Sequence, residues 1–224
     1  MTMVLMMTLG SALVLITSSE TSIAANFHAA HQAFYAADAV FERALADLRS
    51  SADWSAVLDG TTSSTFVDGS PSGTRTLADG SSIDLAQLTN FANCRKPTAC
   101  TGADIAATTA ERPWGVNNPR WRPYVYGRLA DSVGVGTVRS QFYVVAFVGD
   151  DSSENDGDPT RDGVSVGSSP NPGVGIVSIR AEAFGPRNAH RAIEATVARI
   201  DPAAAAPAGG GITDLRILSW REIY

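Results

Sequence analysis

Residues 27–48 read FHAAHQAFYAADAVFERALADL, and apolar side chains recur in them at alternating steps of three and four. This spacing places the apolar side chains on one face of an α-helix. Arg43 and Asp47 also have the i,i+4 spacing of a helical ion pair. We therefore expect a long helix here with one apolar seam, made of Phe27, Ala30, Phe34, Ala37, Phe41, Ala44 and Leu48.

The segment before this seam is almost wholly apolar. Residues 3–16 read MVLMMTLGSALVLI, and no Lys or Arg precedes Arg43. As a helix, these residues would span roughly 21 Å, which is less than the ~30 Å hydrocarbon core of a bilayer. Neither Gly nor Pro interrupts residues 11–50, so one helix over residues 1–50 is predicted, with a length of roughly 75 Å. Its first half has no amphipathic face and needs lipid or neighbouring helices.

Composition limits the classes of function. The chain has 224 residues, of which 44% are hydrophobic, so it suits one β-rich domain with an appendage. Its 17 basic and 23 acidic residues give a net charge of −6, and Lys96 is its only lysine. A nucleic-acid groove needs many phosphate contacts, which this balance disfavours.

The remainder of the chain predicts short strands joined by turns. Pairs such as Asp59-Gly60, Asp68-Gly69, Ser72-Gly73 and Asp79-Gly80 are typical of turns. Alternating patterns predict strands over 141–148, 175–184, 189–200 and 212–222, with a hairpin over 185–188. The polar partners in this alternation include Ser178, Arg180 and Glu182, so we expect an antiparallel sheet with one dry face, covered by the helix. Residues 83–92 fit either a helix or an extended segment, and Trp114 and Trp121 are not placed.

The expected fold is therefore α+β, with a long helix over 1–50 and a β-rich head over 51–224. Cys94 and Cys100 lie six apart with a Pro between them. Zinc would need two more ligands nearby, so a disulfide-closed loop is favoured over zinc and over two unpaired thiols. A disulfide would place the head outside the cytoplasm.

An acidic stretch over 149–163 is the one candidate metal site. Six carboxylates this close would repel one another, and Ca²⁺ could organise them. The match to a calcium-loop template is partial, because Ser152 and Gly163 occupy its first and last positions. A solvated loop between strands is the favoured interpretation, and calcium is the alternative; the residues concerned are Asp150, Asp151, Glu154, Asp156, Asp158 and Asp162.

Enzymatic motifs are weak. Residues 163–167, GVSVG, match the nucleophile elbow of serine hydrolases, but a Pro-rich segment follows instead of a helix. His28 and His31 are three apart, yet no third metal ligand lies within a turn. We expect no catalytic residues and no required cofactor.

The opening helix resembles the N-terminal region of PilX-type minor pilins. The likeness rests on residues 12–21 (ALVLITSSET), 23–27 (IAANF) and 33–39 (AFYAADA). Residues 180–186 (RAEAFGP) and 218–222 (LSWRE) are similar, less specifically, to the carboxyl domains of these proteins. The basic leader and the acidic fifth residue of prepilins are not visible, so we expect the leader and about ten apolar residues to be encoded upstream.

The resemblance implies an assembly subunit of a type IV pilus or a related secretion pseudopilus. Its partners would be other pilin subunits and, before assembly, the bacterial inner membrane, with a periplasmic head; neither nucleic acid nor a small-molecule substrate is implied. The finished subunit would lie in a pilus at the cell surface. The residues expected to pack the helix are Leu13, Leu15, Ile16, Phe27, Phe34, Phe41 and Leu48.

An alternative function comes from a different class. Ser22-Ile23-Ala24 could form a small-x-small cleavage site, although a basic start is absent. The chain would then be a secreted, β-rich binding module with a cleaved signal. A serine hydrolase acting through Ser165 is the third and least favoured alternative.

Overall fold

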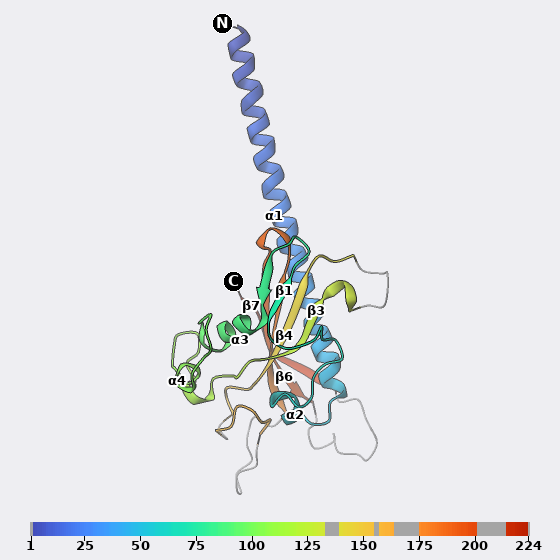
Figure 1. Ribbon diagram of the computed structural model, residues 1–224, viewed down its shortest axis with the longest axis vertical. Coiled ribbons are helices and arrows are strands. Elements are labelled where there is room, and N and C mark those ends of the chain that lie inside the picture. The colour runs from blue at the N-terminus through green and yellow to red at the C-terminus, as the bar shows by residue number, and fades with distance from the viewer. Residues whose placement is uncertain (1, 133–138, 155–156, 164–174, 201–213, 224) are drawn as a thin grey trace.

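A computed structural model describes residues 2–132, 139–154, 157–163, 175–200 and 214–223. A single helix, α1 (Thr2–Ser50), projects from a head that contains all the other elements (Figure 1). The helices of the head are α2 (Ser55–Leu58), α3 (Leu85–Cys94), α4 (Gly102–Ile105), η1 (Gly115–Asn117), η2 (Leu129–Asp131) and η3 (Pro186–Asn188). Its strands are β1 (Thr74–Thr76), β2 (Ser82–Asp84), β3 (Arg122–Arg128), β4 (Tyr143–Asp150), β5 (Ile176–Phe184), β6 (His190–Arg199) and β7 (Leu215–Ile223). The predicted α+β fold is confirmed.

The second half of α1 forms the centre of the main core. Its seam residues from Ala37 onward are buried against apolar side chains of the large sheet. Alanines at several contact positions let the helix axis lie close to the strands, since a small side chain adds little spacing. The buried residues of the helix are Ala33, Ala36, Ala37, Val40, Phe41, Ala44, Leu45 and Leu48.

The C-terminal end of α1 is fastened to β6. The indole nitrogen of Trp54 donates to the Leu48 carbonyl at 3.1 Å, which folds the chain back after the helix ends. The Arg199 guanidinium lies 4.3 Å from the centre of the Trp54 ring and donates to the carbonyls of Ser51 and Ala52. Cation–π contact and charged hydrogen bonds together fix the angle between helix and sheet. Ahead of this end, the predicted Arg43–Asp47 ion pair is present at 3.0 Å.

The large sheet has the order β3-β4-β5-β6-β7, and each neighbouring pair is antiparallel. Four of these strands were predicted to within about three residues, and the hairpin over 185–188 is confirmed as the turn between β5 and β6. β3 was missed. It carries Pro123 at an irregular register next to Val125, and proline is tolerated only at edges or bulges, so its sequence does not read as a strand.

The two margins of this sheet differ. Residues 64–68 run beside β3, where Tyr126 donates to the Phe66 carbonyl at 3.1 Å and accepts from the Asp68 amide at 3.2 Å. At the other margin, β7 pairs only with β6 among the strands that the structure describes. The β3 margin is therefore covered by the chain itself, and β7 is the exposed edge strand.

A second layer covers part of the sheet face opposite α1, so the expectation of a sheet with one covered face is wrong. Strand β4 is buried on both faces, because a hairpin of β1 and β2 together with α3 packs on that side. On this face Ser178, Arg180 and Glu182, which were expected to face solvent, each expose less than 10% of their surface. This second core consists of Leu77, Leu85, Ala92, Trp121, Tyr126, Tyr143, Val145 and Phe147.

The structure also settles the segments whose conformation or position the sequence did not decide. Residues 83–92 are extended up to Asp84, whose carboxylate accepts from the Gln87 amide at 2.9 Å and caps α3. Trp121 is buried in the second core, and Trp114 precedes η1. The predicted turns at Asp59-Gly60 and Asp79-Gly80 are confirmed, each with a left-handed glycine.

Candidate assembly surface

The projecting half of α1 is an apolar rod with no cover from the head. Leu13, Leu15 and Ile16 each expose more than half of their side-chain surface. One 18-residue window of α1 has a mean hydropathy of 1.7, none of it buried, and α1 is long and apolar enough to cross a membrane. Glu20 is the only charged residue before Asp38. This half of the helix therefore fits an apolar environment that the head does not supply.

Five hydroxyl groups in the same half donate to backbone carbonyls of the helix itself. Thr17 donates to the carbonyls of Leu13 and Val14, and Thr21 donates to the carbonyl of Thr17 at 2.8 Å. Thr8, Ser11 and Ser22 make similar bonds three or four residues back. Internal bonds of this kind remove the cost of placing hydroxyls in lipid or between packed helices.

The head divides the apolar seam into two parts. Phe41 and Leu48 are fully buried in the core of the head, so they are not available to a neighbouring subunit. Phe34 is half-buried, and Phe27 exposes 66% of its surface. Of the expected packing residues, Leu13, Leu15, Ile16 and Phe27 are thus free for contact with another molecule, and Phe34 lies at the border.

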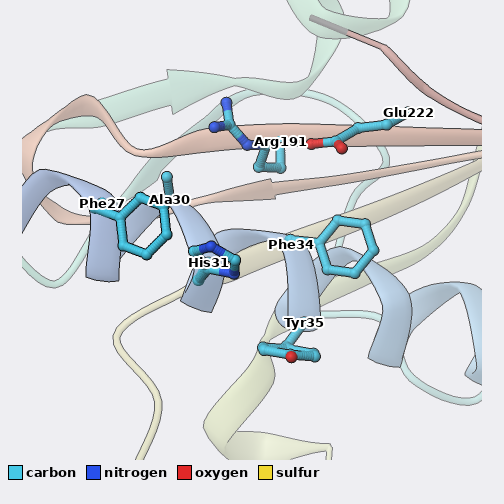
Figure 2. Close-up of a pocket in the computed structure, with 7 residues that line it drawn as sticks. All are labelled: Phe27, Ala30, His31, Phe34, Tyr35, Arg191 and Glu222. Atoms are coloured by element: carbon cyan, nitrogen blue, oxygen red, sulfur yellow. Dashed lines mark ion pairs between the residues drawn. The ribbon is translucent and has the colours of Figure 1, made fainter.

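A recess of about 320 Å³ lies where the free and docked parts of α1 meet. Figure 2 shows the aromatic rings on the helix and, on the neighbouring strands β6 and β7, Arg191 with the Glu222 carboxylate pointing toward it. The Arg191 Nε lies 3.2 Å from a Glu222 oxygen. The recess is lined by Phe27, Ala30, His31, Phe34, Tyr35, Arg191 and Glu222.

Aromatic contacts extend this recess in both directions. The Phe27 ring meets the His31 ring edge-on at 4.3 Å between centres, and Phe34 meets Trp220 of β7 at 6.1 Å. Trp220 remains 46% exposed. Arg191, Glu222 and Trp220 were not predicted as site residues; the polar–apolar alternation of the last strand could have placed Trp220 beside the helix, but nothing local to the sequence joins β6 to residue 27.

The predicted disulfide between Cys94 and Cys100 is present. It joins the C-terminus of α3 to the segment before α4, where Thr101 and Asp104 form a reciprocal capping box. Hydrogen bonds from Lys96 and Thr101 lower the pKa of Asp104 to about 2. A disulfide of this kind fits a head that folds in an oxidising compartment.

The acidic stretch does not converge on one point among the residues that the structure describes. Asp158 accepts from Thr160, and Asp162 accepts from the Gly175 amide at 2.7 Å. Asp150 and Glu154 are buried, whereas Asp151 bonds Ser153. Within the described ranges no group of three His, Cys, Asp or Glu is placed to hold a metal, and Asp156 lies outside them. Calcium binding stays a prediction.

The remaining polar cluster surrounds a buried carboxylate. Glu182 accepts from Arg180 at 2.6 Å and lies 2.9 Å from the Nε2 atom of His190. Burial raises the pKa of Glu182, but the bonds to His190 and Arg180 outweigh burial and lower it to about 2. Ser165, the hydrolase candidate, lies outside the described residues, and His31 contacts Phe27.

Comparison of the chain with family models, curated proteins and solved structures found no match.

Proposed function

We propose that this chain is an assembly subunit of a filament built on membrane-inserted helices, as a minor pilin of a type IV pilus or a related secretion pseudopilus is. The observation that supports this proposal is the split seam of α1. The part from Ala37 onward holds the helix in the head, and the preceding part continues on the same face with Phe27 and the apolar rod exposed. A subunit that moves from the membrane into a filament needs a helix face that contacts lipid first and the helices of other subunits afterwards.

The continuity of α1 favours an anchor over a cleaved signal. The helix runs without interruption through Ser22, Ile23 and Ala24 into the buried positions that begin at Ala33. Cleavage after Ala24 would remove the apolar rod. Phe27 and the recess would then lie next to the new, free N-terminus of the helix. In the proposed role, the rod stays attached and holds the head on the periplasmic side of the inner membrane.

The recess suggests how neighbouring subunits make contact. Its floor is aromatic and its rim carries the Arg191–Glu222 pair, so an apolar side chain of an adjacent helix can enter while the rim stays hydrated. Other pilin subunits are the partners proposed for this surface.

The test compares two neighbouring exposed residues in the full chain, expressed with its native filament machinery. Phe27→Asp places a charge on the seam, and His28→Asp is the matched control off the seam. We expect Phe27→Asp to lower recovery in sheared filaments at least about tenfold, with the thermal unfolding of the head unchanged, because the residue lies outside the core. His28→Asp should leave recovery unaltered.

Membrane association is measured in the same strains. Leu15→Arg adds a charge to the rod that costs about 3 kcal/mol at a bilayer centre, so extraction by alkaline carbonate should increase. Equal filament recovery of Phe27→Asp and the native chain would contradict the proposal. So would a mature protein in solution whose first residue is Ala25 or Asn26, which would support the secreted module instead.

A further inference from the structure

The face of the sheet turned away from α1 carries two rows of polar side chains. The register of β5, β6 and β7 places three hydroxyl side chains next to one another. Two residues further along each strand, three charged side chains are also neighbours. Ser219 of β7 accepts from the backbone amide of Thr196 at 3.2 Å, which fixes one end of the hydroxyl row. The rows are Ser178, Thr196 and Ser219, followed by Arg180, Glu194 and Arg221.

These rows form the floor of a groove of about 670 Å³. One wall comes from α3 and from residues 110–121, and it includes Arg95, Arg112, Trp114 and Trp121. Four arginines and three glutamates line the groove, so it has a positive balance on a chain whose net charge is −6. A local field of this sign favours an anionic ligand.

Arg112 is the arginine of the groove that has no glutamate partner among the described residues. It is 93% buried, its Nη2 atom donates to the Ile105 carbonyl at 3.0 Å, and its buried Nε has no acceptor. Within the described residues Arg112 makes no ion pair, whereas Arg95, Arg180 and Arg221 pair with Glu111, Glu182 and Glu194. Burial and the nearby Arg95 lower the pKa of Arg112. A buried, unpaired guanidinium is costly, and a bound carboxylate would relieve that cost.

Two features of the groove indicate which groups a ligand would have besides its carboxylate. The indole of Trp114 is 43% exposed at the groove wall, which offers a flat apolar platform. The hydroxyl row offers groups that both donate and accept, as a ligand rich in hydroxyls requires. An extended peptide would instead pair with the backbone of a strand edge, and the floor here is a sheet face.

We propose that this groove binds an acidic oligosaccharide, with a uronate carboxylate on Arg112, a sugar ring on Trp114, and sugar hydroxyls on the row from Ser178 to Ser219. The inference concerns the head and does not depend on the assembly of α1. It gives the subunit a ligand of stated chemistry on the face that helix packing leaves free.

The test is calorimetric titration of the full chain in detergent micelles with trigalacturonate, maltotriose and triglutamate. We expect binding of trigalacturonate, with maltotriose and triglutamate at least about tenfold weaker. Arg112→Gln should weaken binding of trigalacturonate at least about tenfold, because the ligand carboxylate loses a positively charged partner. The matched control, Arg216→Gln, removes an exposed arginine outside the groove and should have no effect.

A second variant keeps the test decisive if Arg112→Gln does not fold. Trp114→Ala removes a partly exposed side chain, so we expect unchanged thermal unfolding and weaker binding of trigalacturonate. No binding of trigalacturonate, equal binding of maltotriose, or equal weakening by Arg216→Gln would overturn the proposal. Binding of triglutamate as tight as that of trigalacturonate would also overturn it and would assign the groove to acidic peptides.

Discussion

Asn93 and Trp121 hydrogen-bond each other reciprocally. The Asn93 amide donates to the Trp121 carbonyl at 2.8 Å, and its oxygen accepts from the Trp121 backbone amide at 2.9 Å. The side chain of α3 thus pairs with the chain just before β3 as a neighbouring strand would. Since Trp121 lies in both the second core and the groove wall, this pair holds the second layer on the sheet.

We expect Asn93→Ala to lower the free energy of unfolding by about 2–4 kcal/mol, because both backbone groups of Trp121 lose a buried partner. Gln87→Ala, an exposed change on the same helix, should cost less than about 0.5 kcal/mol. Urea unfolding followed by tryptophan fluorescence measures both values. Equal stability of the two variants would show that the Asn93 pair does not hold this layer.

The split seam predicts opposite effects for two phenylalanines of α1. Phe41→Ala should lower the free energy of unfolding of the head by about 3–5 kcal/mol, because it leaves a cavity in the main core. Phe27→Ala should change it by less than about 0.5 kcal/mol. Thermal unfolding in micelles compares them, and a large loss for Phe27→Ala would mean that the head uses more of the helix than the seam indicates.

Glu182 predicts a dependence of stability on pH. Its folded pKa of about 2 lies below the ordinary value of 4.5, so the ionised group stabilises the fold above pH 4.5. This contribution, on the order of 3 kcal/mol, is lost as pH falls from 4.5 toward 2.

Glu182→Gln should therefore reduce stability at pH 7 and flatten the profile of unfolding free energy between pH 5 and 2. Glu111→Gln, at an exposed ion pair, is the control and should leave the profile intact. Chemical unfolding at a series of pH values decides between them. A profile of Glu182→Gln parallel to that of the native chain would refute the assignment.

The disulfide predicts a local effect. Replacement of Cys94 and Cys100 by serine should cost about 2 kcal/mol and increase amide exchange over residues 94–105, where the bridge closes a short loop. Exchange in the docked half of α1 should not change, because that half belongs to the other core. Hydrogen exchange measured by mass spectrometry separates the two regions, and uniform acceleration in both would count against a local role.

The sequence predicted the elements whose pattern is local. The seam of α1 repeats over six turns, and the alternation of β5 and β6 is regular, so periodicity alone places them. It also predicted the disulfide, since Cys94 and Cys100 had no competing ligands nearby.

Features that depend on distant contacts could not be predicted. Leu77 and Leu85 are far from Phe147 in the chain, and only the folded sheet brings them together in the second core. Periodicity showed which side of α1 is apolar, but it did not show that the head buries this side only from about Phe34 onward. The rim of the recess at Arg191 and Glu222 likewise depends on the pairing of β6 with β7.

The unequal margins of the sheet limit how copies of this protein can join. Among the described strands of the large sheet, β3 is covered by residues 64–68, so a second copy could extend this sheet only at β7, and two β7 margins that meet would leave no margin of this sheet for a third copy. In the filament proposed above, subunits would therefore join through α1, with the heads as side branches rather than links.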